Sequence, residues 1–298
     1  MVAIADTVAA PPPRPKNATL HFFGRLFREK PLGAFGFVIC AIFLFCGVFA
    51  DVLAPYGYNQ ISPINRLKPP GEKFWFGTDN LGRDMFSRTL YGAQLSVIIG
   101  LAAAALATFV SVFIGILSGY LGGKIDMVLQ RFVDAWMSFP DLIILIVVVS
   151  VVGPGMGPVI VILGLLYGIA GSRIIRGAVL SVRENAYVHA AQSTGATLPR
   201  ILWKHILPNV MAPVIVLFTT RVGLVILAES GLAFLGLGVP PPAPTWGGML
   251  SGAGRSFMYL APWLALVPGL CITIVVYGIN VFGDALRDLL DPRMRGSR

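Results

Sequence analysis

The sequence predicts an all-α integral membrane protein that crosses the bilayer about six times. Two observations support this fold class. Of the 298 residues, 56% are hydrophobic and only 12% are charged, whereas a soluble domain is about 45–50% apolar and about 25% charged. The apolar residues also gather in runs near the roughly 20 residues that a helix needs to cross about 30 Å of hydrocarbon. Most of the chain is therefore expected to lie in a bilayer.

The spans follow from long apolar runs bounded by charges, glycine and proline. They fall at about residues 31–53, 93–120, 127–152, 158–180, 211–237 and 261–284. Only residues 121–126 separate the second and third runs, so these spans are expected to be antiparallel neighbours. Residues 153–157, which contain Gly and Pro, can hardly be helical and separate the third and fourth runs.

The sequence divides into a tail, a membrane domain and a second tail. Residues 1–30 are predicted to be a cytoplasmic Pro-rich tail that ends in an interfacial helix over 21–30, where aromatic and basic residues alternate. Residues 31–286 form the predicted transmembrane domain, and 287–298 a cytoplasmic tail. No cleavable signal peptide is evident, because the first apolar run begins near Pro31 and is long enough to span.

Charge distribution predicts the orientation. Most of the 23 Lys and Arg residues lie on the side of the two termini, so the positive-inside rule places both ends in the cytoplasm. The segment at about 54–90 is then an outer loop, and the segment at about 181–209 is cytoplasmic. The net charge of +9 is scattered and forms no dense basic stripe, which argues against a nucleic-acid partner.

The sequence offers no catalytic, metal or cofactor site. The cysteines lie in apolar runs and the histidines are dispersed, without ligand spacing: Cys40, Cys46, Cys271, His21, His189 and His205. The only Gly-Lys pair, Gly123-Lys124, is followed by Ile125 and does not complete a phosphate-binding Walker A loop. The chain is expected not to hydrolyse ATP by that route.

The cytoplasmic segment carries a spaced motif of small residues. Ala190 and Ala191 let a short helix approach another surface closely, Gly195 permits a sharp change of direction, and Pro208 can begin the next helix. This pattern predicts a helical hairpin that lies across the membrane face. Its polar side suits docking of a partner, and an amphipathic connector without a partner is the alternative.

This segment resembles the EAA loop of ABC importer permeases. In that family Glu-Ala-Ala is followed by Gly four positions after the second Ala, and later by Leu-Pro; here His189 stands where the acidic residue is usual. The resemblance implies a helix that sits in a cleft of a separate ATP-hydrolysing subunit and transmits its closure to the spans. The implied coupling residues are His189, Ala190, Ala191, Gln192, Ser193, Thr194, Gly195, Leu207 and Pro208.

A second motif lies in the outer loop. Asp79, Arg83 and Asp84 could lock one another by charge-assisted hydrogen bonds, while Gly77 and Gly82 make the turns. The run Gly-Thr-Asp-x-x-Gly-Arg-Asp, together with residues 228–248, resembles the C-type subunit of the dipeptide, oligopeptide and nickel permease family. The charged residues could dock an extracytoplasmic binding protein or simply satisfy one another.

Charged and aromatic residues in or near the spans are further candidates. Arg221 and Glu229 are about two helical turns apart and are expected to face the pathway or a partner permease, with a buried structural role as the alternative. Pro140, between Asp134 and Asp141 in sequence, could form a gating hinge or an inert kink. Trp246 and Trp263 suit anchors at the membrane interface.

The resemblance implies a permease subunit of an ATP-driven importer in the bacterial plasma (inner) membrane. It would form half of the pathway for a peptide or similar small solute. The implied partners are a homologous second permease, two ATP-binding subunits that use ATP and Mg, a solute-binding protein and the lipid bilayer. Dipeptides, oligopeptides, glutathione, opines, haem and nickel chelates remain open as cargo. The alternative is an ion-coupled carrier, although no intramembrane proton relay is visible.

Overall fold

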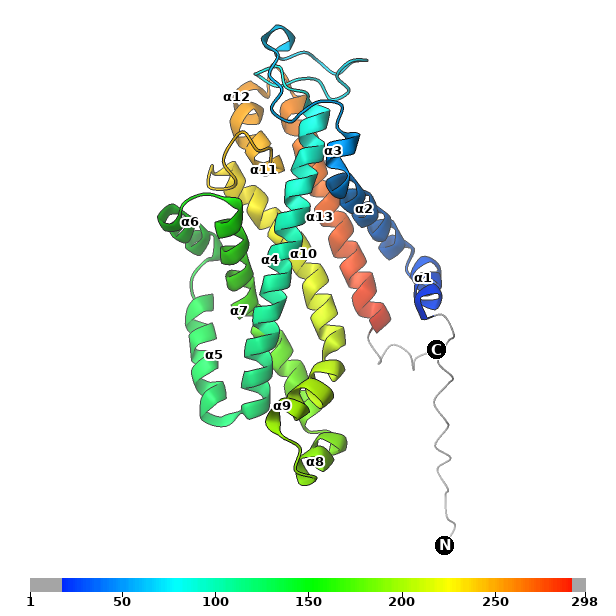
Figure 1. Ribbon diagram of the computed structural model, residues 1–298, viewed down its shortest axis with the longest axis vertical. Helices are drawn as coiled ribbons and strands as arrows, with labels where there is room; N and C mark the ends of the chain where they lie inside the picture. Colours follow the sequence, from blue (N-terminus) through cyan, green and yellow to red (C-terminus); the bar gives the residue numbers. More distant parts are fainter. Residues whose placement is uncertain (1–17, 291–298) are drawn as a thin grey trace.

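The computed structural model describes residues 18–290. Residues 1–17 and 291–298, which the sequence assigns to the two terminal tails, lie outside the described residues. The described chain is helical and elongated, with its long helices running roughly along the long axis (Figure 1).

Five helices are long and apolar enough to cross a membrane. They are α2 (Pro31–Val48), α4 (Met85–Leu121), α7 (Met156–Arg183), α10 (Met211–Phe234) and α13 (Trp263–Leu290). The most extensive packing is between α4 and α7, and glycines permit this close approach. A Cβ at Gly115 would lie 2.7 Å from Cβ of Ile175, so no larger residue fits there without a shift.

The third predicted span, at about 127–152, is wrong as a single helix. It consists of α5 (Gly123–Met137) and α6 (Asp141–Val152), which are bent by 86° relative to each other. Pro140 has no backbone N–H and adopts an extended conformation (ψ 132°), so it cannot continue α5, while its carbonyl oxygen accepts from the amides of Ile143 and Ile144 to begin α6. The pair is a broken span or a re-entrant segment.

The second span begins earlier than predicted. The helix α4 starts at Met85 rather than near residue 93, because Asp84 caps it and its first two turns carry polar residues that hydropathy does not reveal. With 37 residues, α4 is about 55 Å long, well beyond the roughly 30 Å of hydrocarbon. At least one of its ends therefore extends out of the membrane, and the helical part of the predicted outer loop belongs to it.

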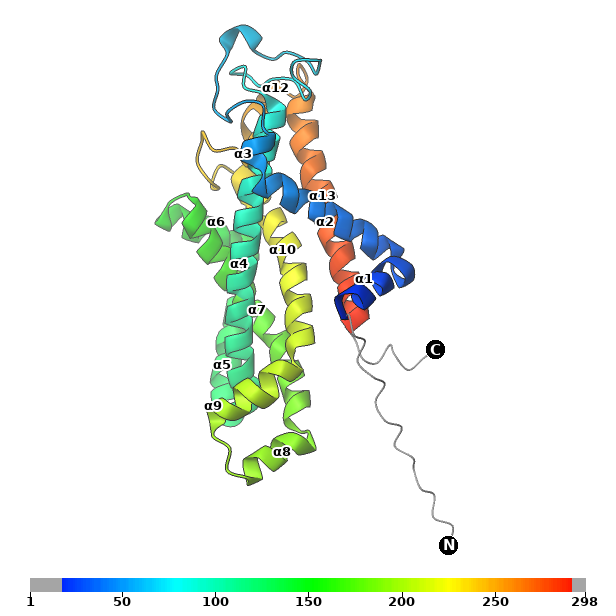
Figure 2. The ribbon, with the colours of Figure 1, turned by 45° about the vertical axis from the view of Figure 1, so that its right-hand side comes forward.

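Short helices occupy both ends of the bundle. The predicted interfacial helix is α1 (Ala18–Glu29), whose buried Leu26 packs against Ala34, Ala285 and Leu289. The remaining helices are α3 (Ala50–Leu53), α8 (Ala186–Ser193), α9 (Leu198–Ile201), α11 (Trp246–Met249) and α12 (Arg255–Phe257), the 3-10 turns η1 (Pro63–Asn65) and η3 (Leu207–Asn209), and the π-helical turns η2 (Leu202–Ile206) and η4 (Leu250–Gly254). Both views place α8 and α9 at one end and the loop that follows α3 at the other (Figures 1 and 2).

Candidate functional site

The helices α8 and α9 form a hairpin at one end of the bundle. The chain leaves α7 at Arg183, runs through α8, turns at residues 194–197 and returns through α9, η2 and η3 to the start of α10. Gly195 has φ +75° in this turn, a conformation that costs a non-glycine residue roughly 1–2 kcal/mol, and no atom lies within 4 Å of the position of a Cβ there. The sharp change of direction predicted at Gly195 is present.

The inner side of the hairpin is apolar and packed. Val188, Ile201, Ile206 and Val210 are 0–3% exposed. They form one cluster with residues of α4, α7 and α10, namely Ile116, Ile175, Val179 and Leu217. Close-packed side chains transmit displacement because the interior has low compressibility. A force on the hairpin would therefore act on three of the long helices.

The outer side of the hairpin is polar and largely open. Of the predicted coupling residues, Ala191 is buried and Leu207 half-buried, while the others are exposed: His189, Ala190, Gln192, Ser193, Thr194, Gly195 and Pro208. Gln192 Nε2 donates to Tyr120 Oη of α4 at 2.9 Å. Among residues 18–290, the ring of His189 has no hydrogen-bond partner. The hairpin thus presents exposed polar groups on a packed apolar base.

Ion pairs brace the helices beside the hairpin. The guanidinium of Arg176 in α7 donates to both carboxylate oxygens of Asp126 in α5, at 2.7 and 2.6 Å. Arg183 Nη1 donates to the carbonyl oxygen of Tyr120 at 3.1 Å. A bidentate pair fixes orientation as well as distance. The ends of α4, α5 and α7 are held together where the hairpin attaches.

At the opposite end, Asp79 is the centre of a buried lock. Its Oδ1 accepts from the backbone amides of Leu81 and Arg83, both at 2.9 Å, and its Oδ2 accepts from Arg83 Nε at 2.6 Å. Arg88 Nε lies 3.7 Å from the same Oδ2. The side chain of Asp79 is 3% exposed, so the carboxylate is satisfied within the loop.

Asp84 does not join this lock, contrary to the predicted three-way arrangement. Its Oδ2 accepts from the backbone N of Ser87 at 2.8 Å and from Ser87 Oγ at 2.7 Å, which caps α4. Gly77 and Gly82 have φ +72° and +73°, as expected of residues that make the turns. The difference arises because the first turn of α4 supplies amides that need an acceptor.

Two tryptophans tie this end to the helices. Trp246 Nε1 donates to the carbonyl oxygen of Thr89 at 3.0 Å, and Trp263 Nε1 donates to that of Thr78 at 3.1 Å. Trp246 is 2% exposed, so the interpretation of this residue as an interface anchor is wrong. Its indole packs inside the protein because Gly92 on α4 leaves room for the ring. A Cβ at Gly92 would lie only 2.7 Å from Trp246 Cδ1.

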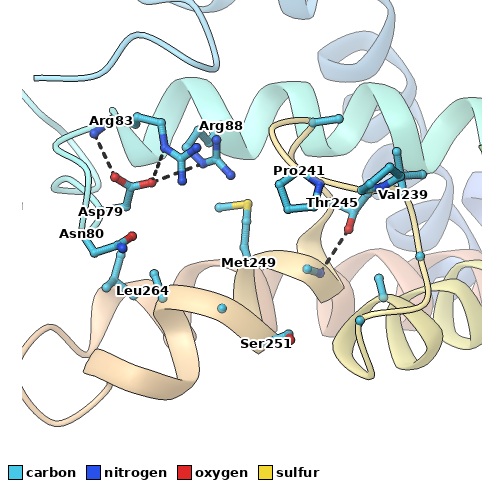
Figure 3. Close-up of a pocket in the computed structure, with 18 of the residues that line it drawn as sticks. Asp79, Asn80, Arg83, Arg88, Val239, Pro241, Thr245, Met249, Ser251 and Leu264 are labelled. Atoms are coloured by element: carbon cyan, nitrogen blue, oxygen red, sulfur yellow. Dashed lines mark hydrogen bonds and ion pairs between the residues drawn. The ribbon is translucent and has the colours of Figure 1, made fainter. Parts of the chain in front are cut away.

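A cavity of about 480 Å³ opens beside the lock. Asp79, Arg83 and Arg88 form one wall, and Val239, Pro241 and Thr245 belong to the loop between α10 and α11 across from them (Figure 3). Met249 and Ser251 line the remaining side. This vestibule joins the outer loop to part of the segment at 228–248, which the sequence resemblance named beside it. Sequence reasoning did not predict that these two segments share a cavity.

The charged residues of the fifth span have different surroundings. Glu229 is 1% exposed and lies inside this chain. The guanidinium of Arg221 lies over the ring of Tyr167, 5.4 Å from its centroid. No ion pair within 4 Å joins Arg221 to Glu229, in keeping with their predicted separation. Sequence reasoning missed the pairing of Arg173 with Asp134, because it assigned Arg173 to the cytoplasmic charges.

Residues 111–296 of the chain match the model of a protein family described as "binding-protein-dependent transport system inner membrane component". The chain belongs to this family. A second model, the N-terminal transmembrane domain of oligopeptide transport permease C, matches residues 22–70 of the permease. The predicted family is therefore confirmed, and the chain is a multi-pass inner-membrane permease. In this family ATP is hydrolysed by separate subunits.

Several curated relatives align along most of the permease. It is 38% identical to the dipeptide transport system permease protein DppC of Alkalihalophilus pseudofirmus, covering 96% of this chain and 95% of the relative. It is 39% identical to the oligopeptide transport system permease protein OppC of Bacillus subtilis, covering 90% and 88%. It is 37% identical to the glutathione transport system permease protein GsiD of Escherichia coli, covering 93% and 91%.

A solved structure has the same fold. The permease matches a chain of the MetNI methionine ABC transporter, solved in an inward facing conformation, with a TM-score of 0.57 and 18% identity. The match covers 70% of this chain and 98% of that chain. The predicted helical, importer-like fold is thus confirmed.

Proposed function

We propose that the chain is one of two homologous permease subunits of an ATP-driven importer of peptides or a related small solute. The relatives named for dipeptide and oligopeptide transport support the cargo class. The relative named for glutathione transport widens that class to other peptide-like acids. The comparisons give no support to the alternative of an ion-coupled carrier acting alone.

The hairpin of α8 and α9 is the proposed docking site for an ATP-binding subunit. The observation that carries this proposal is the division of the hairpin into a packed apolar side and an open polar side. A lever needs both features, because one side must bind a mobile partner and the other must move the spans. Two such subunits, which bind ATP with Mg, would serve the permease pair. This chain itself is proposed to bind no cofactor.

The opposite end is the proposed site for the solute-binding protein. The Asp79 lock makes the loop a firm surface, and the vestibule beneath it offers an entrance of about 480 Å³. In this arrangement both termini lie in the cytoplasm, on the side of α8 and α9. The excess of Lys and Arg on that side supports this orientation.

Gly195→Glu tests the docking proposal. The residue at 195 has open space around it, so a bulky acidic side chain would protrude from the docking face while the core of the hairpin stays packed. We expect the complete importer with this substitution to assemble in reconstituted vesicles. Its peptide uptake per ATP hydrolysed should fall at least tenfold.

Gly195→Asn is the matched control. Asn adopts positive φ more readily than most residues and adds no charge, so uptake should stay within about twofold of the unsubstituted importer. Unchanged uptake with Gly195→Glu would show that no partner docks at this turn. Equal losses with both variants would trace the effect to backbone strain instead.

A further inference from the structure

A second cavity lies where α5 bends into α6. Its volume is about 430 Å³, and its walls include Trp136, Asp141, Tyr167, Arg173, Arg221 and Leu224. Arg221 is about ten residues into α10, or about 15 Å along the helix, which is half of the roughly 30 Å of hydrocarbon. This pocket therefore places charged and aromatic side chains at the depth where charges are most costly.

The guanidinium of Arg221 has no hydrogen-bond acceptor among the residues that the structure describes. Its Nε is buried without a hydrogen-bond partner, and no ion pair within 4 Å reaches it from any residue between 18 and 290. Its Nη2 instead lies close to α7, because Gly171 leaves space where a Cβ would be 3.4 Å away. The charge lies over the face of Tyr167 and interacts electrostatically with Asp141 without a contact within 4 Å. A partly buried cation that lacks a hydrogen-bond acceptor favours an anionic partner.

The second arginine of the pocket is already paired. Arg173 makes an ion pair with Asp134 of α5, and Arg131 lies 3.6 Å from the same carboxylate. Arg173 thus braces α5 against α7 and does not need a ligand. Arg221 is the cation of the described pocket that has no ion pair within 4 Å.

Asp141 supplies the opposite charge. It is the first residue of α6 and is exposed to the pocket. It has no ion-pair partner within 4 Å among the described residues, so it does not neutralise Arg221 by direct contact. One wall thus offers a cation and another an anion that attract each other without direct contact, and the rings of Trp136 and Tyr167 also line the cavity.

We propose that this pocket binds a zwitterionic solute in transit, with its carboxylate on Arg221 and its ammonium group on Asp141. The inference rests on the proposed import function and specifies the chemistry of the pathway. A solute with both charges suits the pocket better than a simple anion, because Asp141 would repel an anion that lacks an ammonium group. The site lies at the bend, so occupancy would also bear on the angle between α5 and α6.

Equilibrium dialysis of radiolabelled alanyl-phenylalanine tests the proposal. The complete importer is held in nanodiscs without its binding protein, so that only the membrane subunits can bind the peptide. Arg221→Met should weaken binding at least tenfold, as expected for loss of a hydrogen-bonded charge contact. Asp141→Asn should weaken binding three- to tenfold, since its side is more exposed. Leu227→Met, on α10 and outside the pocket lining, is the control and should bind like the unsubstituted importer.

Blocked peptides assign each end of the solute. The peptide with a C-terminal amide lacks the carboxylate, so the unsubstituted importer should bind it as weakly as the Arg221→Met importer binds the free peptide. The Arg221→Met importer should bind the amide and the free peptide equally. The N-acetylated peptide lacks the ammonium group, so the unsubstituted importer should bind it as weakly as the Asp141→Asn importer binds the free peptide. The Asp141→Asn importer should bind the acetylated and the free peptide equally. Equal weakening of all three peptides by either variant would overturn the assignment.

Three further outcomes test this pocket assignment and the proposed import function separately. If Arg221→Met prevents assembly with the second permease, then a partner side chain fills the pocket and the proposal is wrong. If the unsubstituted importer takes up peptide in vesicles and yet shows no binding here, the pocket assignment fails while the proposed function stands. Binding without any ATP-dependent uptake would contradict the proposed function alone.

Discussion

The two ends of the permease use their polar residues in opposite ways. In the outer loop, Asp79 accepts two backbone amides and pairs with Arg83 while remaining 3% exposed. In the hairpin, His189 and Gln192 lie on an exposed face, and only Gln192 is tied to another helix. The Asp79 lock satisfies its charges internally, whereas the hairpin leaves polar side chains exposed.

This difference teaches that the polar residues of the outer motif serve the local fold, whereas those of the hairpin are open to the proposed partner. A buried carboxylate that loses its partners costs several kcal/mol, so the outer motif contributes strongly to the local fold. An exposed amide or imidazole contributes little to folding, so the proposed docking role of the hairpin can be tested there with little effect on stability. Substitutions at the two ends should therefore separate stability from transport.

Asp79→Ala should have the largest effect on stability. It leaves Arg83 and Arg88 without their carboxylate, with side chains 12% and 9% exposed, and should cost about 3–5 kcal/mol. We expect a lower thermal denaturation midpoint of the purified protein and faster proteolysis of the outer loop. Asp79→Asn keeps one acceptor oxygen, so its thermal midpoint should lie between those of Asp79→Ala and the unsubstituted protein. A midpoint unchanged by Asp79→Ala would mean that the lock does not stabilise the loop.

Asp84→Ala should have an intermediate effect. It removes the acceptor for the backbone N and Oγ of Ser87, so it should cost about 1 kcal/mol through fraying of the first turn of α4. Hydrogen exchange of amides 86–88 should rise, and Asp84→Ser should restore most of their protection because Ser is also an N-cap residue. Equal exchange in Asp84→Ala and the unsubstituted protein would contradict the capping role.

Gln192→Ala should have the smallest effect on stability. The bond from its Nε2 to Tyr120 Oη is exposed, so its loss should change the thermal midpoint by less than the equivalent of about 0.5 kcal/mol. Uptake per ATP hydrolysed should nevertheless fall if the amide also contacts the ATP-binding subunit. Tyr120→Phe breaks the same bond without altering the hairpin, so a matching loss of uptake would assign the effect to this bond and not to docking.

Local patterns were sufficient for much of this interpretation. Apolar runs located the long helices, and Gly195 marked the turn of the hairpin because its φ of +75° suits glycine. The same reasoning missed the start of α4, since Ser87 and Arg88 resemble loop residues until Asp84 is recognised as a cap. It also underestimated Pro140, where a kink became a bend of 86°.

The pocket at that bend could not be predicted, because its residues come from four helices. Asp141 and Arg221 are separated by 80 positions, and no local pattern relates them. Trp246 was misinterpreted for the same reason, since its partner Thr89 lies on a helix 157 residues away.

The sequence by itself determined the membrane class, the long helices and the hairpin turn, because hydropathy and glycine conformation act within one or two turns of chain. Only the tertiary structure decided which charges are satisfied. That outcome depends on which helices pack together and leave an acceptor within reach, as they do for Arg176 and Asp126 and do not for Arg221.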